Sequence, residues 1–443
     1  MGFVSTKPLA EPSIADPPTV LIASTSWWPF TARIALRFAA LGWRVEAICP
    51  AGHPLRFTQA VARCHPYAAL RPLSALAAAA AARPTLLLPC DERVREHLHA
   101  LMPTGAPLSD LIVRSLGAPD GFAPLLQRAE MIRLAIAAGV RAAPMWPVAS
   151  ASDLRAALAE AGLPAMLKVD GTWGGAGVMA VHGAAEAERA RVLLGRRLAA
   201  SRALKRLLVD RDPFPLLPWL DGTAPRVGVQ RHIAGRPANS LVACWQGEVL
   251  ASIEVEVLRT SLPLGASTVV RTIEHAEMAE TAAVMVRWLG LSGFCGFDFM
   301  LEDGTGAAHL IEVNPRSTPL SHLALGPGRD PVAALAARLT GRGTAASAPM
   351  SHKPLTDNPV IVHFPQAWRQ DPASEVLRTG YHDVPWEDPG LLRELMRAPY
   401  SKRGLLARLI ERAVPRLGTG FSMPERRFGA SAGTASGERG VAA

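Results

Sequence analysis

The chain has 443 residues, of which 49% are hydrophobic and 19% charged, a composition typical of a globular enzyme with more than one domain. Its formal net charge of +9 comes mostly from scattered arginine, with no basic stretch interleaved with aromatic residues, so nucleic acid is not an expected partner. No apolar run reaches the roughly 18 residues that cross a bilayer, so we expect no transmembrane segment.

Residues 18–118 alternate between apolar strand-like runs and amphipathic helical stretches. This rhythm predicts a parallel sheet with ligands at the carboxyl ends of its strands. Residues 25–28 and Asp91 directly follow strands, so we expect them at that edge. Asp91 is equally compatible with a helix N-cap, and the paired tryptophans at 27 and 28 are compatible with simple packing.

The segment AMLKVDGTWGGAGVMAV, residues 165–181, reads as strand, glycine-rich loop and strand. The backbone N–H groups of such a hairpin can cover phosphates, although a plain β-turn is the alternative. Only five of the 47 basic residues are lysine. Lys168 ends the first strand, which suggests that a compact ammonium is needed there, as for a phosphate. The loop glycines are Gly171, Gly174, Gly175 and Gly177.

The segment GFDFMLEDGTGAAHLIEVNPR, residues 296–316, predicts a β-hairpin with its turn at residues 302–306. This folding places Asp298 nearly opposite Glu312, and directly opposed residues have Cβ atoms about 5 Å apart. Asn314 shares a face with Glu312, because side chains two apart point the same way.

Two carboxylates and one amide oxygen therefore converge beside Arg316. Like charges this close are unfavourable unless a cation lies between them. Hard oxygen ligands suit Mg²⁺, which commonly binds together with substrate phosphates. The alternative is that the acids serve solubility, although they lie within apolar strands and not at the hairpin tip.

These motifs, in this order, resemble the ATP-grasp superfamily over roughly residues 119–342. The resemblance implies a mixed α/β and α+β fold. An N-terminal Rossmann-like domain, residues 1–118, would precede a two-lobed ATP-grasp domain, residues 119–342, with lobes of about 119–225 and 226–342. A C-terminal extension, residues 343–443, would follow. Within it, the sequence predicts a basic amphipathic helix near residues 401–418 and disorder from about 424.

The resemblance also implies roles for individual residues. Lys168 and the glycine loop would contact the ATP phosphates, Arg316 would face the reacting phosphate, and Mg²⁺, or alternatively Mn²⁺, would be bound by Asp298, Glu312 and Asn314. The nucleotide would further contact Arg128, Gln230, Arg231, His232 and Ile233. The chain departs from the family pattern at Gln230 and Asp298, where Glu is common, and in lacking an acid for the ribose.

The expected reaction transfers the γ-phosphoryl group of ATP to a carboxylate, and an amine or another nucleophile such as a thiol then attacks the acylphosphate. The catalytic residues expected are Arg316, Lys168 and Arg271. Arg271 is a candidate for binding the substrate carboxylate or stabilising the acylphosphate, or else a surface cation on a strand edge. His322 is a candidate substrate contact, or else a structural histidine. Alternatives are a small-molecule kinase, a bicarbonate-activating module and a non-catalytic nucleotide-binding scaffold.

The expected location is the cytoplasm. The N-terminal residues carry charges and no apolar core, unlike a secretory signal. The five cysteines are odd in number and irregularly spaced, which favours reduced, buried thiols. The expected partners are small molecules, a carboxylate and an amine or other nucleophile, and a homodimer is compatible with the resemblance.

Overall fold

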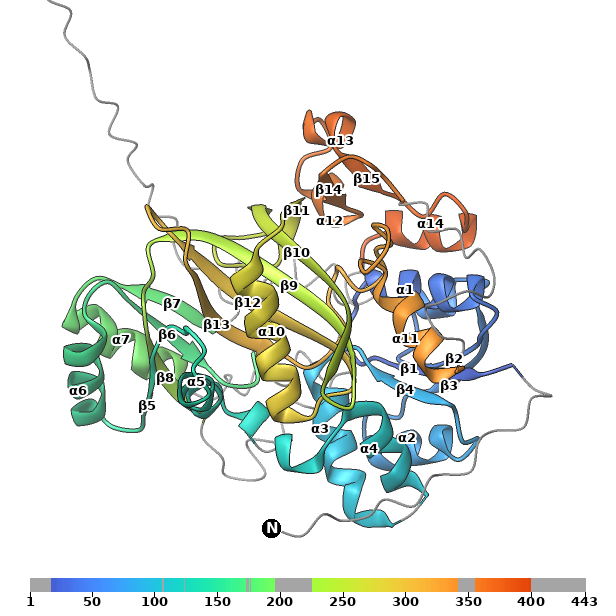
Figure 1. Cartoon of the computed structure of the whole chain (residues 1–443), viewed down its shortest axis with the longest axis horizontal. Helices are drawn as coiled ribbons and strands as arrows, with labels where there is room; N and C mark the ends of the chain where they lie inside the picture. The colour runs from blue at the N-terminus through green and yellow to red at the C-terminus, as the bar shows by residue number, and fades with distance from the viewer. Residues whose placement is uncertain are drawn as a thin grey trace, which may run out of the picture.

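The computed structural model describes residues 17–105, 107–122, 124–172, 175, 177–195, 225–341 and 355–399. These residues form three β-sheets with helices packed around them (Figure 1). The predictions made for Gly174, for the amphipathic helix near 401–418 and for the tail from about 424 lie outside the described residues.

The N-terminal sheet is parallel, with strand order β3-β2-β1-β4, as the alternating sequence pattern predicts. Val20 and Ile22 of β1 face one hydrophobic core, and Leu21 and Ala23 face another. A strand covered on both faces must be apolar throughout, which explains the continuous apolar run. The elements are β1 (Thr19–Ala23), α1 (Phe30–Ala40), β2 (Arg44–Cys49), β3 (Val61–Pro66), α2 (Pro72–Ala80), β4 (Leu86–Pro89), α3 (Glu92–Leu101) and α4 (Leu108–Leu116).

The second sheet has strand order β5-β8-β6-β7 and is antiparallel throughout. Helices α6 and α7 pack with it around a separate core, whereas α5 packs in the same core as α10 (Ala276–Leu289). Helix α6 begins at a reciprocal capping box between Ser150 and Asp153, which satisfies its first free N–H groups. The elements are α5 (Arg128–Ala137), β5 (Met145–Val148), α6 (Ala151–Ala161), β6 (Ala165–Val169), β7 (Val178–Val181), α7 (Ala184–Leu194) and β8 (Val227–Arg231).

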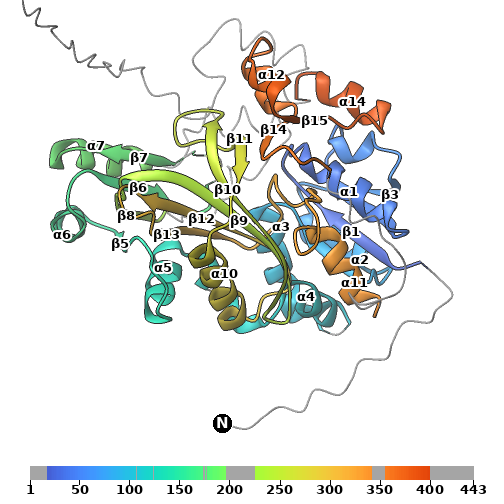
Figure 2. The same ribbon diagram turned by 45° about the horizontal axis from the view of Figure 1, so that its top comes forward.

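The largest sheet has strand order β13-β12-β9-β10-β11-β14-β15. Its last two strands come from the C-terminal segment, so residues beyond 355 extend this sheet (Figure 2). The elements are β9 (Gly235–Trp245), β10 (Glu248–Thr260), β11 (Ser267–Thr272), α10 (Ala276–Leu289), β12 (Gly293–Glu302), β13 (Ala308–Asn314), α11 (Pro331–Leu339), β14 (Val360–His363), α12 (Gln366–Gln370), α13 (Val376–Thr379), β15 (Tyr381–Asp383) and α14 (Pro389–Met396).

The two faces of the large sheet have different neighbours. Leu241 and Ile253 share a core with strand β1 and helix α1 of the N-terminal domain. Phe297 and Phe299 on the other face pack against helix α10. Cross-strand partners lie on the same face, so the register decides which side chains face the N-terminal domain.

No helix among the described residues is long and apolar enough to span a membrane.

Candidate functional site

The predicted pair of carboxylates is in register on the hairpin of β12 and β13. Asp298 pairs directly with Glu312, and Gly296 pairs with Asn314. One Asp298 oxygen accepts a hydrogen bond from Nδ2 of Asn314 at 3.1 Å, and the other accepts one from Nδ2 of Asn239 on β9 at 2.6 Å. Both carboxylates are half-buried, so the pair is shielded but within reach of a bound ion.

The pKa values of this pair show how strongly the two charges interact. Burial and the neighbouring Glu312 raise the pKa of Asp298 to about 6. Burial also acts to raise the pKa of Glu312, but Arg128 and Lys168 outweigh it and hold that pKa below its usual value. Asp298 has two neutral amides as its hydrogen-bond donors, so a cation at this position would relieve a charge that the amides leave unneutralised.

The donor set fits Mg²⁺ in kind, because two carboxylates and one amide provide hard oxygen ligands. Among the described residues, no three His, Cys, Asp or Glu side chains gather as a metal site. Mg²⁺ usually keeps several waters and binds substrate phosphates, so two carboxylates and one amide would supply only part of its ligands.

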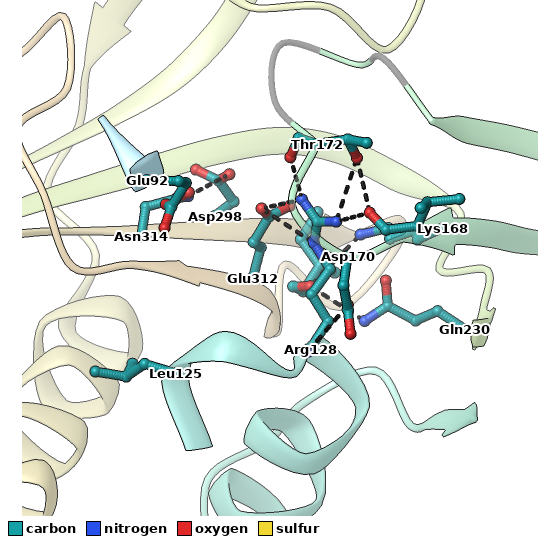
Figure 3. A network of polar contacts seen from close by, with 12 residues as sticks. Glu92, Leu125, Arg128, Lys168, Asp170, Thr172, Gln230, Asp298, Glu312 and Asn314 are labelled. Atoms are coloured by element: carbon teal, nitrogen blue, oxygen red, sulfur yellow. Dashed lines mark hydrogen bonds and ion pairs between the residues drawn. The ribbon is translucent and has the colours of Figure 1, made fainter. Parts of the chain in front are cut away.

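Lys168 and Gln230 join the second sheet to this hairpin (Figure 3). Nζ of Lys168 lies 3.5 Å from the carbonyl oxygen of Ile311, and Nε2 of Gln230 donates to the same oxygen at 3.2 Å. Lys168 is only 5% exposed, and burial lowers its pKa although Glu312 acts in the opposite direction. A buried ammonium with one long hydrogen bond still has donors to give to an anion.

Gln230 is almost fully enclosed, and its amide nitrogen also donates to the carbonyl oxygen of Ala143 at 3.1 Å. Arg231 and His232 follow it and are exposed, and Ile233 is half-buried. Nη2 of Arg231 donates to the carbonyl oxygen of Glu160 at 2.9 Å. The structure thus brings Gln230 to the hairpin. It leaves Arg231 at the end of β8 and the next two residues in the connection to β9, and the predicted contact of these three residues with a base stays a prediction.

Arg128 links the metal hairpin to the glycine loop. It begins helix α5, and its Nη2 lies 2.9 Å from Oε1 of Glu312. Nη2 also donates to the carbonyl oxygen of Thr172 at 2.6 Å, and Nη1 donates to that of Val169. Asp170 accepts from the backbone N–H of Arg128 at 3.3 Å. The local sequence pattern did not single out Thr172 or Asp170, because their partner lies more than 40 residues away.

The glycine loop lies against the turn between β10 and β11. Gly171, Gly175 and Gly177 all have positive φ angles, which only glycine adopts without strain. A Cβ atom at Gly175 would lie 2.2 Å from the carbonyl oxygen of Leu264, whereas one at Gly171 would meet nothing within 4 Å. The close approach at Gly175 therefore needs a residue without a side chain.

Two single variants separate this contact from backbone strain. Gly171→Ala is expected to cost about 1 kcal/mol through its positive φ alone. Gly175→Ala carries the same strain and also clashes with Leu264, so it should displace the loop and lower the turnover of Mg-ATP further. Steady-state ADP release and thermal unfolding of both variants measure the difference. Equal losses in the two variants would contradict a role for the contact.

Arg316 contacts the N-terminal domain. Its Nε donates to Oε1 of Glu92 at 3.0 Å, its Nη2 to Oδ1 of Asn314 at 3.1 Å, and its Nη1 to the carbonyl oxygen of Ser317 at 3.2 Å. Glu92 was not among the predicted residues, although it directly follows Asp91 at the expected edge of the sheet. Asp91 is the N-cap of α3, where it accepts from the backbone N–H of Val94.

Two predicted residues are not brought to this group. Arg271 of β11 pairs with Glu256 of β10, which pairs with Ala238 of β9, which in turn pairs with Phe299 of β12. Because paired residues share a face of the sheet, Arg271 lies on the face of Phe299, opposite to that of Asp298. The Arg271 side chain is 51% exposed and lies 3.9 Å from Glu256. Its alternative interpretation as a surface cation on a strand agrees with this position.

His322 is enclosed, with 2% exposure, and its Nε2 lies 2.6 Å from Oδ2 of Asp383 on β15. Arg33 of helix α1 lies 2.9 Å from the other oxygen of the same carboxylate. These contacts connect three distant segments of the chain, which agrees with the structural alternative for His322.

Comparison with known proteins supports the resemblance found in the sequence. Residues 223–319 match a family model described as an ATP-grasp domain. A search of curated proteins finds no match to the chain.

Solved structures similar to the chain include N5-carboxyaminoimidazole synthetase from Staphylococcus aureus, with 12% identity and a TM-score of 0.52 over 72% of this chain and 77% of that one. Biotin carboxylase from Campylobacter jejuni, in a β-γ-ATP complex, has 15% identity and a TM-score of 0.53 over 75% and 72%. The biotin carboxylase domain of Hydrogenobacter thermophilus 2-oxoglutarate carboxylase, with MgADP, ADP and bicarbonate, has 14% identity and a TM-score of 0.53 over 74% and 71%. These similarities confirm the fold class predicted from the sequence.

Proposed function

We propose that this chain, a member of the ATP-grasp superfamily, is an ATP-dependent ligase that activates a carboxylate as an acylphosphate for attack by an amine or another nucleophile. The observation that carries the proposal is the convergence of two carboxylates, an amide and three cations from the β12–β13 hairpin and the residues after it, strand β6 and helix α5. These groups are Asp298, Glu312, Asn314, Lys168, Arg128 and Arg316. The substrates are small molecules, and we propose a cytoplasmic location, where ATP is supplied.

Phosphoryl transfer needs positioning and charge neutralisation more than a side-chain nucleophile. Lys168 and Arg128 would bind the phosphates, since both are cations at the junction of the second sheet and the hairpin. The glycine loop would exclude water from the reacting groups and so protect the acylphosphate from hydrolysis. Asp298, Glu312 and Asn314 would hold Mg²⁺, which neutralises phosphate charge when bound.

Binding of Mg-ATP would require a specific rearrangement of the ion pair formed by Arg128. Arg128 already forms an ion pair with Glu312 at 2.9 Å. With a metal ion held by Glu312, the guanidinium of Arg128 would be available to a phosphate group, and it could donate two parallel hydrogen bonds to two of the phosphate oxygens. Exchange of one anionic partner for another keeps the half-buried arginine neutralised throughout.

Bicarbonate is a second candidate for the acid. Its support is that the similar solved structures include carboxylases, one of them in complex with a bicarbonate anion. Bicarbonate and an organic carboxylate present the same planar anionic group to Arg316, and both form a mixed anhydride with phosphate. The identity of the acid therefore needs a direct assay.

The products of the reaction test the proposal. With Mg-ATP, a panel of carboxylic acids including bicarbonate, and hydroxylamine in place of the natural nucleophile, the protein should release ADP and form the hydroxamate of the right acid. An acylphosphate reacts readily with hydroxylamine, and omission of the acid is the control. AMP with pyrophosphate would indicate adenylate chemistry and contradict the proposal. A phosphorylated acceptor without hydroxamate would indicate a kinase. ATP binding without turnover would indicate a non-catalytic scaffold.

A further inference from the structure

Glu92 connects the N-terminal domain to the reacting end of the candidate site. It is the first residue of helix α3, at the carboxyl edge of the parallel sheet. One of its oxygens lies 3.0 Å from Nε of Arg316, and the other lies 2.6 Å from Nη2 of Arg95. The side chains of Glu92, Arg316 and Arg95 are 15%, 13% and 5% exposed, so both ion pairs are well shielded from water.

The hydrogen bonds of Arg316 do not use all of the N–H donors of its guanidinium. A guanidinium has five N–H donors in a fixed plane. Within the part of the chain that the structure describes, three of them are used, by Glu92, Asn314 and the carbonyl oxygen of Ser317. Two donors, one on each Nη atom, remain for an anion. The plane of the guanidinium is set by all three partners together.

The three partners of Arg316 differ in what they contribute. Asn314 and Ser317 are within two residues of Arg316 on the same chain segment, and both are neutral acceptors. Glu92 is 224 residues away, is charged, and is itself held in place by Arg95. Burial acts to raise the pKa of Glu92, but Arg95 and Arg316 outweigh it, so the carboxylate stays ionised at neutral pH.

We propose that Glu92 is a positioning residue, which holds the Arg316 guanidinium in the orientation that leaves two N–H donors for the reacting anion. The proposal rests on the proposed function, because Arg316 is the cation assigned there to the reacting group. It also gives the N-terminal domain a part in the reaction, because the domain would orient Arg316, which lies just beyond the end of β13.

Three variants of the full-length protein test this role. Glu92→Ala removes the acceptor, Glu92→Gln keeps an acceptor oxygen but removes the charge, and Glu96→Gln is the matched control. Glu96 is on the same helix, one turn further along, and its side chain is exposed. Crystal structures of the protein and its variants report the position of Arg316. ADP release from Mg-ATP in bicarbonate buffer gives kcat and the KM for ATP.

The expected result is a graded loss in kcat. Loss of a group that orients a ligand typically lowers activity by about ten- to a hundredfold. We expect Glu92→Ala near the upper end of this range and Glu92→Gln near the lower end, with Arg316 displaced in Glu92→Ala. The KM for ATP should stay within about twofold, since Arg316 is not assigned to ground-state ATP binding. Glu96→Gln should match the unmodified protein in both measurements.

The outcomes separate this proposal from the proposed function. If Arg316 keeps its position in Glu92→Ala and kcat is unchanged, Glu92 has no positioning role. If both variants only lower thermal stability and Arg316 keeps its orientation, Glu92 is merely structural. If the unmodified protein releases no ADP with any acid, the proposed function fails, while the crystal structures still decide whether Glu92 orients Arg316.

Discussion

Asp298→Asn is expected to lower Mg-ATP turnover by at least about a hundredfold, the usual effect of removing a group that stabilises the charge of a reacting phosphate. Asp298 is one of the two carboxylates assigned to Mg²⁺, and the amide of asparagine is a weak, neutral ligand. Glu312→Gln should have an effect of similar size, because it removes the other carboxylate. Turnover is measured as ADP release at varied Mg²⁺ concentration, where a metal-ligand variant should also need more Mg²⁺.

The fold should persist in Asp298→Asn. The raised pKa of Asp298, about 6, means that its ionised form is disfavoured in the folded protein, so loss of the charge does not remove a stabilising interaction. The new amide can accept only one of the hydrogen bonds that Asn239 and Asn314 now donate, which offsets part of this gain. Circular dichroism and thermal unfolding would check the fold.

Asp303→Asn is the matched control for this experiment, because it removes the same charge from the exposed tip of the same hairpin. It should leave turnover unchanged. Retention of Mg²⁺-dependent turnover in both Asp298→Asn and Glu312→Gln would contradict the metal assignment.

Lys168→Ala is expected to weaken Mg-ATP binding by about ten- to a hundredfold. One charge-assisted hydrogen bond to a phosphate contributes roughly 1.5–3 kcal/mol, and each 1.4 kcal/mol is about a factor of ten in Kd. Isothermal titration calorimetry measures the Kd directly. Lys168→Met is the informative second variant, because it keeps most of the buried side-chain volume and removes only the charge.

Lys168→Arg should rescue binding poorly. Lys168 is buried with its Nζ against the carbonyl oxygen of Ile311, and a planar guanidinium needs more space and more hydrogen-bond acceptors than a compact ammonium. If Lys168→Ala and Lys168→Met both bind Mg-ATP with unchanged Kd, the nucleotide phosphates bind elsewhere, and the assignment of the glycine loop is lost as well.

Local patterns in the sequence were sufficient to predict the structural features that depend only on residues close together in the chain. The alternation in residues 18–118 predicted the parallel sheet, because strand and helix periods are properties of short segments. The turn at residues 302–306 predicted that Asp298 lies near Glu312, but not the exact pairing: the register next to the turn would place Asp298 opposite Ile311, and a β-bulge beside Phe299 brings Glu312 opposite Asp298 instead. Asp91 caps a helix, as a residue of that type before an amphipathic stretch commonly does.

Contacts between distant segments could not be predicted in this way. Asn239 donates to Asp298 from 59 residues away, and Arg128 pairs with Glu312 from 184 residues away. Sγ of Cys49 and Sγ of Cys64 lie 3.6 Å apart on adjacent strands, although their spacing in the sequence matches no known pattern. Each contact depends on how whole sheets and helices pack, which no single segment encodes.

The position of Arg271 shows the physical reason most clearly. As a cation near the expected site, it was a reasonable candidate for binding substrate. Its face, however, depends on the register of β11 with β10, of β10 with β9 and of β9 with β12, and a shift of one residue in any pairing would reverse it. Sequence alone therefore determined which residue types are present and which local elements they form. Only the tertiary structure decided that Arg271 faces away from Asp298 and that Glu92 faces Arg316.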